Sequence, residues 1–291
     1  MKNQAVRRLV ALVFLIPVFV AMAASAQGPD WTEPFPPFRI AANLYYIGSH
    51  GLANFLVTTP QGNILINCDM AANVPMLESS IRQLGFRFRD TKIILISHAH
   101  WDHDAACGSI RQITGARYMV MAQDVPVVES GGRADFDYGN VAADQYPRAK
   151  VDRALHDGDT VRLGGTVLVA HLTPGHTRGC TTWTLNVTEG DRTYHVVIVG
   201  STSVNPGYKL VNNRSYPGIA RDYERTFRVL RSLPCDIFLG AHGSYFDLPA
   251  KFAALQAGHP QAFVDPAGYA AFVNEAERTF QAELTKQRSG K

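Results

Sequence analysis

The hydrophobic residues of this chain fall into short runs separated by turn residues, a pattern that predicts many β-strands. In the first half, the expected strands are 44–49, 54–59, 64–68, 93–96 and 117–121. In the second half, they are 160–163, 166–172, 180–187, 193–199 and 236–239. The run 93–96 is continuously apolar, which is typical of a strand buried on both faces.

Apolar residues three and four positions apart predict helices between these strands. The expected helices are 73–85, 104–114, 123–129, 220–232, 251–256 and 267–286. The segment 130–150 is rich in glycine, acids and tyrosine, and we expect it to be an excursion over the surface. Each half is rich in strands and ends in helices, so the chain is expected to be an α/β protein. Two β-sheets would pack face to face with helices on their outer faces, and no linker divides the chain into separate domains.

The N-terminus has the pattern of a secretory signal. Lys2, Arg7 and Arg8 precede an apolar run over 9–24, and Ala24-Ser25-Ala26 matches a cleavage site. A retained membrane anchor fits less well, because the run is short and contains Pro17. We therefore expect a signal peptide at 1–26 and a single domain at 27–291. The mature protein would lie in the periplasm, free of the membrane.

Removal of the signal peptide also changes the charge. The full chain has a formal net charge of +3, and residues 1–26 hold three basic residues and no acid, so the mature chain is neutral. A neutral chain gives no sign of a basic groove for nucleic acid.

Four cysteines remain after cleavage: Cys68, Cys107, Cys180 and Cys235. They allow three complete pairings. The sequence does not decide between these pairings, a single bridge and free thiols.

Four possible metal ligands directly follow the buried strand 93–96. They are His98, His100, Asp102 and His103. Since the whole chain has 10 histidines among 291 residues, three of them beside an aspartate are an improbable chance cluster. Residues i and i+2 of an extended segment point the same way, so His98 and His100 can converge on one ion. Zinc suits these donors, although iron and manganese accept them too.

Two later strands also end in a histidine within a glycine-containing loop. His176 lies in Thr173-Pro174-Gly175-His176-Thr177, and His242 lies in Gly240-Ala241-His242-Gly243. With the cluster at 98–103, they provide six ligands, enough for three at each of two zinc ions.

Together these motifs resemble the metallo-β-lactamase superfamily over essentially the whole mature chain. The resemblance implies an αββα sandwich of two mixed β-sheets. It also implies one zinc held by His98, His100 and His176, and a second held by Asp102, His103 and His242.

The strand at 196–199 points to a branch of that superfamily. It leads into Gly200-Ser201-Thr202, with neither the bridging aspartate of glyoxalase II and lactonase enzymes nor a cysteine ligand. A serine here is similar to subclass B3 metallo-β-lactamases, which implies a monomeric enzyme that confers antibiotic resistance. Its substrates would be penicillins, cephalosporins and carbapenems, whose β-lactam ring is opened by a metal-bound hydroxide.

The resemblance also suggests roles around the metals. Asp102 would orient the hydroxide, and Tyr208 would reach the lactam carbonyl. The expected substrate contacts are Ser201, Ser203, Asn205 and Trp31, with the two serines near the substrate carboxylate. The alternatives are a related hydrolase of lactones or thioesters, an iron-dependent sulfur oxygenase, and a metal-stabilised binding protein. The missing bridging aspartate disfavours the first, and a complete second ligand set disfavours the iron enzyme. Six intact ligands and an open site for hydroxide disfavour the binding protein.

Overall fold

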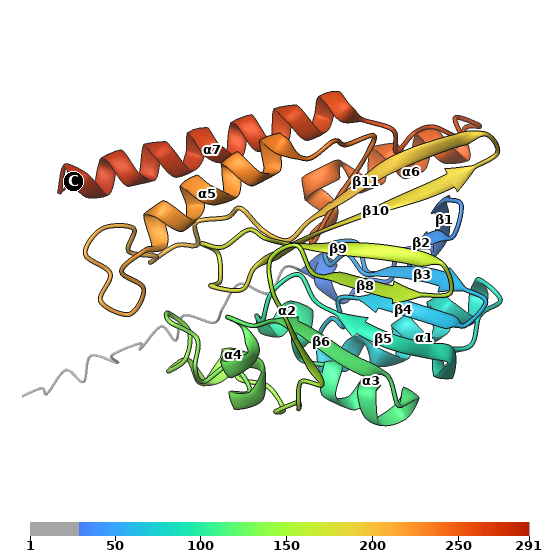
Figure 1. Cartoon of the computed structure of the whole chain (residues 1–291), viewed down its shortest axis with the longest axis horizontal. Helices are drawn as coiled ribbons and strands as arrows, with labels where there is room; N and C mark the ends of the chain where they lie inside the picture. Colours follow the sequence, from blue (N-terminus) through green and yellow to red (C-terminus); the bar gives the residue numbers. More distant parts are fainter. Residues whose placement is uncertain (1–28, 291) are drawn as a thin grey trace, which may run out of the picture.

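The computed structural model describes residues 29–290, so the expected signal peptide at 1–26 lies outside the described part. The chain forms two facing β-sheets with helices on their outer sides (Figure 1). The first sheet has seven strands in the order β1-β2-β3-β4-β5-β6-β7. These are β1 (Phe38–Ala41), β2 (Leu44–Tyr46), β3 (Phe55–Thr59), β4 (Gly62–Ile66), β5 (Thr91–Leu95), β6 (Arg117–Met121) and β7 (Arg153–Leu155). Neighbours are antiparallel from β1 to β4 and parallel from β4 to β7.

The second sheet has five strands in the order β12-β11-β10-β9-β8. They are β8 (Thr160–Leu163), β9 (Thr166–Leu172), β10 (Thr181–Glu189), β11 (Arg192–Val199) and β12 (Ile237–Gly240). β11 and β12 are parallel and the other neighbours are antiparallel. Both sheets are therefore mixed, as the resemblance implied.

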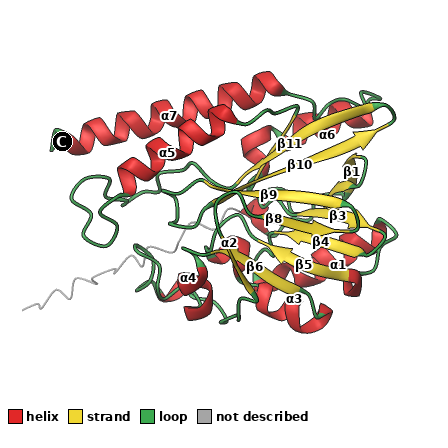
Figure 2. Cartoon of the chain, in the orientation of Figure 1, coloured by secondary structure: helices red, strands yellow, loops and turns green. Residues whose placement is uncertain are grey.

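Helices cover the outer face of each sheet (Figure 2). On the first sheet these are α1 (Val74–Gln83), α3 (Cys107–Thr114) and α4 (Val125–Ser130), and on the second α5 (Ile219–Ser232) and α7 (Pro266–Arg288). The remaining helices are α2 (Trp101–Asp104), α6 (Leu248–Gln256) and the 3-10 turns η1 (Pro29–Trp31), η2 (Ala71–Asn73), η3 (Phe88–Asp90), η4 (Ala142–Asp144) and η5 (Gly243–Phe246). Within residues 29–290, no helix is both long and apolar enough to cross a membrane.

Strand β5 shows how the layers share the core. Ile93 and Leu95 face the large cluster that lies between the sheets, whereas Ile94 packs with α1 and α3. Because successive side chains of a strand point to opposite faces, a continuous apolar run fits this central position. The expectation of a strand buried on both faces is confirmed.

Three local expectations need correction. The helix expected at 104–114 is two helices, because the Ala106 amide donates to the Asp69 carbonyl instead of continuing α2. Asp104 ends α2, and its carboxylate accepts the hydroxyl of Tyr118. Strands β1 and β7, of four and three residues, were not expected from the sequence.

The segment 130–150 is the third correction. It is not a simple surface excursion, because it folds back over the end of β5. Tyr146 is buried, and its hydroxyl donates to the carbonyl of Ala99 (2.8 Å).

The rims of the two sheets meet where the strands with histidine motifs end. The Thr181 amide of β10 donates to the carbonyl of Ser97, just after β5 (2.7 Å), and the indole of Trp183 donates to Ile96 (3.0 Å). On the other side, the Ala53 amide donates to the carbonyl of Ala241, just after β12 (2.9 Å). These bonds bring loops from distant parts of the sequence to one edge, which is where ligands bind in many sheet proteins.

Candidate metal centre

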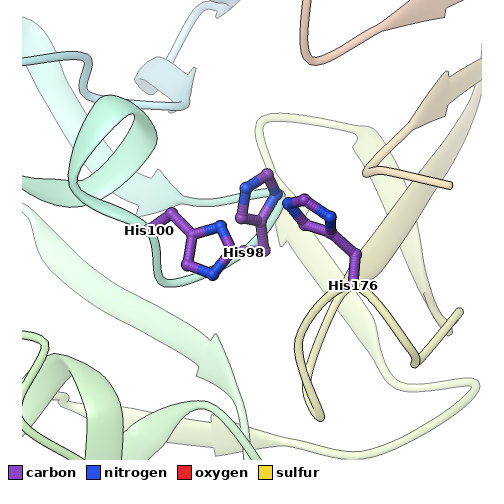
Figure 3. Close-up of side chains that lie close together, drawn as sticks. All are labelled: His98, His100 and His176. Atoms are coloured by element: carbon purple, nitrogen blue, oxygen red, sulfur yellow. The ribbon is translucent and has the colours of Figure 1, made fainter. Parts of the chain in front are cut away.

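The first donor set combines a loop from each sheet. His98 and His100 lie on the extended segment after β5, and His176 lies on the loop after β9 (Figure 3). Their ring centroids are 4.5 to 4.8 Å apart, and one ligand atom from each lies within 4.8 Å of the others. The three predicted ligands therefore converge.

Hydrogen bonding shows which nitrogen of His176 is available. Its Nδ1 lies 2.8 Å from the carbonyl oxygen of Ser203, which can only accept, so Nδ1 carries the proton. Nε2 is then left with a free lone pair, the state that a metal ligand requires.

The second donor set is equally compact. Asp102 Oδ2 lies 3.2 Å from His103 Nε2 and 3.7 Å from His242 Nε2, and the two nitrogens are 3.3 Å apart. Atoms about 2.1 Å from a tetrahedral zinc are separated by about 3.4 Å, so these distances fit one ion. His98 also lies close to Asp102 and His103, which places the two sets side by side.

Burial favours the neutral, metal-binding form of three of the histidines. Desolvation lowers the pKa of His98, of His176 to about 3 and of His242 to about 4, so these imidazoles are neutral. Burial by itself raises the pKa of Asp102, but His103 and His242 outweigh it and hold that pKa well below its usual range. Carboxylate and imidazole nitrogen are donors that zinc prefers. The residues present fit two zinc ions.

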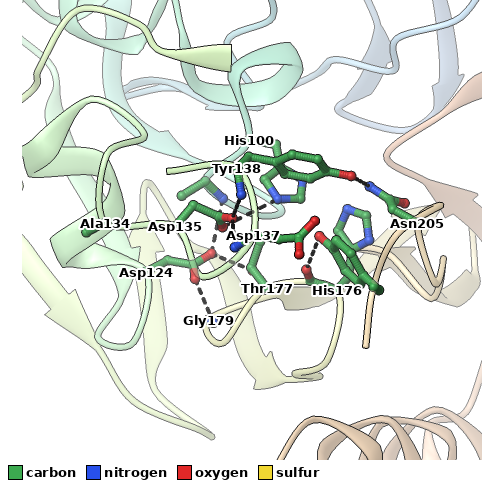
Figure 4. A network of polar contacts seen from close by, with 12 residues as sticks. His100, Asp124, Ala134, Asp135, Asp137, Tyr138, His176, Thr177, Gly179 and Asn205 are labelled. Carbon is green, nitrogen blue, oxygen red and sulfur yellow. Dashed lines mark hydrogen bonds and ion pairs between the residues drawn. The ribbon is translucent and has the colours of Figure 1, made fainter. Parts of the chain in front are cut away.

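A buried carboxylate joins the two loops of the first set. Asp124 accepts the Ala99 amide (3.1 Å), the Thr177 hydroxyl (2.7 Å) and the Gly179 amide (2.7 Å), as Figure 4 shows in part. A Cβ at Gly179 would lie 2.6 Å from Asp124, so only glycine allows this approach. Asp124 thus fixes the loop of His98 and His100 against the loop of His176.

A disulfide and two backbone bonds hold the second set. Cys68 and Cys107 are bridged, and Cys180 and Cys235 are free thiols. The Cys68 amide also donates to the carbonyl of His103 (2.9 Å), and the Ala106 amide donates to Asp69 (3.1 Å). The sequence left the pairing open, and the structure selects one bridge beside the metal-binding helix α2.

A pocket of about 600 Å³ opens onto both donor sets. Its lining includes four of the six expected ligands, His100, Asp102, His176 and His242. The remaining lining residues come from the N-terminal segment, the segment after β5, the 130–150 segment and the loops after β11 and β12: Trp31, Ala99, Trp101, Gly132, Asp135, Tyr138, Val141, Asp144, Ser203, Asn205, Pro206 and Tyr245. Such a mixture of aromatic and polar groups around a concave site is typical of small-molecule binding.

Three of the four expected substrate contacts line this pocket. Trp31 packs against Trp101 (ring centroids 5.7 Å apart) and His242 (5.9 Å), while Ser203 and Asn205 lie on the opposite loop. Ser201 is set back from the pocket: it is 1% exposed, and its hydroxyl lies 3.1 Å from that of Tyr245.

Tyr208 also lies behind the pocket wall. It is 2% exposed, and its hydroxyl donates to the carbonyl of His176 (2.9 Å). In this position the hydroxyl supports the His176 loop and does not face the pocket. Its expected contact with a lactam carbonyl stays a prediction.

Sequence reasoning missed Asp124, Asp135 and Tyr245. Tyr245 places its hydroxyl 3.1 and 3.2 Å from those of Ser201 and Ser203, so it belongs to the polar wall. Its position three residues after His242 was the available signal. No spacing in the sequence links Asp124 or Asp135 to the histidines.

Comparison with known proteins gives the family. The model of the family described as "Metallo-beta-lactamase superfamily" matches residues 51–242, which include all six expected ligands. The chain belongs to the metallo-β-lactamase superfamily.

Within this superfamily, solved structures of named β-lactamases are similar over nearly the whole chain. Native FEZ-1 metallo-β-lactamase from Legionella gormanii is 55% identical, with a TM-score of 0.88, over 88% of this chain and 98% of that one. BJP-1, a subclass B3 metallo-β-lactamase of Bradyrhizobium japonicum, is 35% identical, with a TM-score of 0.84, over 90% and 98%. The structural similarity is thus to subclass B3 of the superfamily, and the chain is a metal-dependent hydrolase.

Curated relatives match over shorter stretches. A probable metallo-hydrolase of Burkholderia pseudomallei is 30% identical over 56% of this chain and 54% of its own length. A hydroxyacylglutathione hydrolase of Cereibacter sphaeroides is 27% identical over 67% and 65%. The chain therefore spans between half and two thirds of these relatives.

Proposed function

We propose that this protein hydrolyses the β-lactam ring of penicillins, cephalosporins and carbapenems, and so confers antibiotic resistance. One observation carries the proposal: the six donors assemble as two complete sets at one pocket, in a chain 55% identical to FEZ-1 along its length. His98, His100 and His176 would hold one zinc, and Asp102, His103 and His242 the other.

The reaction needs a nucleophile and a stabilised leaving group. Bound zinc supplies both needs, since it lowers the pKa of coordinated water to about 7 and accepts developing negative charge. Asp102 turns Oδ2 toward His103 and His242, which leaves its other oxygen to accept a hydrogen bond from the attacking water. A serine nucleophile is not required, because within the described residues Ser201 lacks a histidine partner and bonds to Tyr245.

The substrate's carboxylate needs hydrogen-bond donors in the pocket. Ser203 and Tyr245 both line it and are 3.2 Å apart between hydroxyls, so they can donate to the same carboxylate. Ser201 acts behind them by orienting the Tyr245 hydroxyl. Asn205 donates to the hydroxyl of Tyr138 (3.0 Å), which joins the two sides of the pocket, and Trp31 supplies an apolar wall.

Hydrolysis of thioesters is the alternative, because hydroxyacylglutathione hydrolases are among the relatives. In that branch the strand equivalent to β11 is followed by an aspartate that bridges the metals. Here β11 is followed by Gly200 and the buried Ser201, so no carboxylate is available at this point. The absence of the bridging group favours the β-lactam assignment.

One experiment separates these activities. Purified protein should hydrolyse a chromogenic cephalosporin, lose that activity with a chelator, and regain it with zinc. S-lactoylglutathione serves as the thioester control and should be hydrolysed far more slowly. Thioesterase activity without cephalosporin turnover would overturn the proposal, as would cephalosporin turnover that survives complete metal removal.

We also propose export to the periplasm and action as a monomer. The Cys68–Cys107 bridge supports an oxidising compartment, where disulfides persist. Mass spectrometry of the periplasmic protein should give an N-terminus at Gln27. An intact Met1 in the membrane fraction would contradict export, and a stable dimer in sedimentation would contradict the monomer.

A further inference from the structure

Asp135 lies over the outer edge of His100. It belongs to the segment between α4 and β7, which folds back over the end of β5 (Figure 4). Its carboxyl group is 3% exposed, and Oδ2 lies 3.7 Å from His100 Nε2. Among the described residues, His100 Nε2 is a buried atom without a hydrogen-bond partner, and Asp135 Oδ2 is an acceptor facing it.

Backbone hydrogen bonds fix the Asp135 carboxylate. Its other oxygen, Oδ1, accepts the backbone amides of Asp137 (2.8 Å) and Tyr138 (2.7 Å). The ring of Tyr138 packs edge-on against that of His100, with centroids 5.3 Å apart. The loop therefore holds one carboxylate oxygen in place and directs the second at the imidazole.

This arrangement favours one nitrogen of His100 as the metal donor. A carboxylate only accepts hydrogen bonds, so it favours the tautomer with the proton on Nε2. Nδ1 is then left with its lone pair directed away from Asp135. The Ser203 carbonyl fixes the tautomer of His176 in a comparable way, by accepting a hydrogen bond from Nδ1.

We propose that Asp135 is the positioning residue for His100: it holds the imidazole in the tautomer and orientation that the three-histidine zinc site needs. The inference rests on the proposed function only in treating His100 as a zinc ligand. A carboxylate that receives the outer N–H of a ligating histidine raises its basicity, and loss of such a partner typically weakens metal binding about 10- to 100-fold.

Asp135→Asn is the matching substitution. The amide oxygen can still accept the two backbone N–H groups, so the loop keeps its anchor, whereas the amide NH₂ cannot accept from His100. Asp137→Asn is the control. It removes the same charge from the same loop, but the Asp137 side chain is exposed and has no hydrogen bond to a ligand within residues 29–290.

The measurement is zinc affinity by chelator competition, without substrate. It is made in the full chain and in a His242→Ala background, where the three-histidine site remains. We expect Asp135→Asn to weaken zinc binding about 10- to 100-fold in both backgrounds, and Asp137→Asn to stay within twofold of the parent protein. Thermal unfolding of the metal-free proteins should be equal for all variants.

Three results would overturn the proposal. Asp135→Asn could leave zinc affinity unchanged, or raise only the KM for a cephalosporin, which would make Asp135 a substrate contact. A loss of affinity that scales with a lower melting temperature of the metal-free protein would show a role in the fold alone. Since the zinc titration needs no β-lactam, its outcome is independent of whether the β-lactamase assignment holds.

Discussion

The two donor sets lie side by side, but different structures hold them. The three-histidine set is formed by loops from both sheets, joined by the buried carboxylate of Asp124 and by the backbone around Ser203. The Asp102, His103 and His242 set instead depends on the bridge beside α2, and the His242 side chain is 19% exposed. The first site is therefore enclosed by hydrogen bonds between sheets, whereas the second has a covalent support and an open side.

This difference predicts that the two zinc ions do not behave alike. Both sites join the two sheets, since Asp102 follows β5 and His242 follows β12, but the first is enclosed by hydrogen bonds and should form with the fold. The second site can lose its metal through the open side near His242 while the sheets stay intact. Stepwise chelation should remove the second zinc first.

The largest effects on metal content and turnover are expected from His98→Ala and His242→Ala, which we compare with each other. His98 lies close to donors of both sets, so His98→Ala should weaken both ions and reduce turnover roughly a thousandfold or more. His242→Ala should leave one zinc per chain. Metal analysis of the purified variants checks this, and two zinc ions retained by His242→Ala would show that the second set is misassigned.

Removal of the disulfide tests the covalent support. The bridge closes a loop with a sequence separation of 39, for which loop entropy gives a stabilisation of up to about 4 kcal/mol. The double variant Cys68→Ser/Cys107→Ser should lose stability in urea unfolding and bind the second zinc more weakly. Cys235→Ser, which removes a free and partly exposed thiol, is the control. Equally weaker binding of both zinc ions would contradict a covalent support specific to the second site.

Asp102→Asn should affect the second site without unfolding it. The amide weakens zinc binding and misplaces the attacking water, so turnover should fall by about a hundredfold, or about 2.7 kcal/mol. Steady-state kinetics under saturating zinc measures this. Near-normal turnover would mean that Asp102 has no role in placing the nucleophile.

The smallest effect is expected at Ser201. Its hydroxyl touches Tyr245 and not the pocket, so Ser201→Ala removes one hydrogen bond worth about 1 kcal/mol. We expect about a fivefold rise in KM with little change in kcat. Abolished turnover, or an acyl-enzyme found by mass spectrometry, would instead indicate a serine mechanism.

The sequence predicted those parts of the site whose signal is local. His98 and His100 follow an apolar strand at an i, i+2 spacing, and that strand does lie between two layers. The helix boundary at Ala106 could not be predicted, because its cause is a bond to Asp69, which is distant in sequence. The residues that support the expected ligands could not be predicted from the sequence for the same reason. Asp124 bonds to Ala99, 25 residues away, and Asp135 faces His100, 35 residues away, and only the folded chain brings them together.

The aromatic contact between Trp31 and His242 makes the metal centre visible to fluorescence. The chain has three tryptophans; Trp31 and Trp101 line the pocket, and Trp183 is buried between the sheets. Emission from the first two will respond to their surroundings as zinc or substrate enters, while Trp183 provides a nearly constant background. Metal loading and substrate binding can thus be followed in the unmodified protein, without a chromogenic compound or an attached dye.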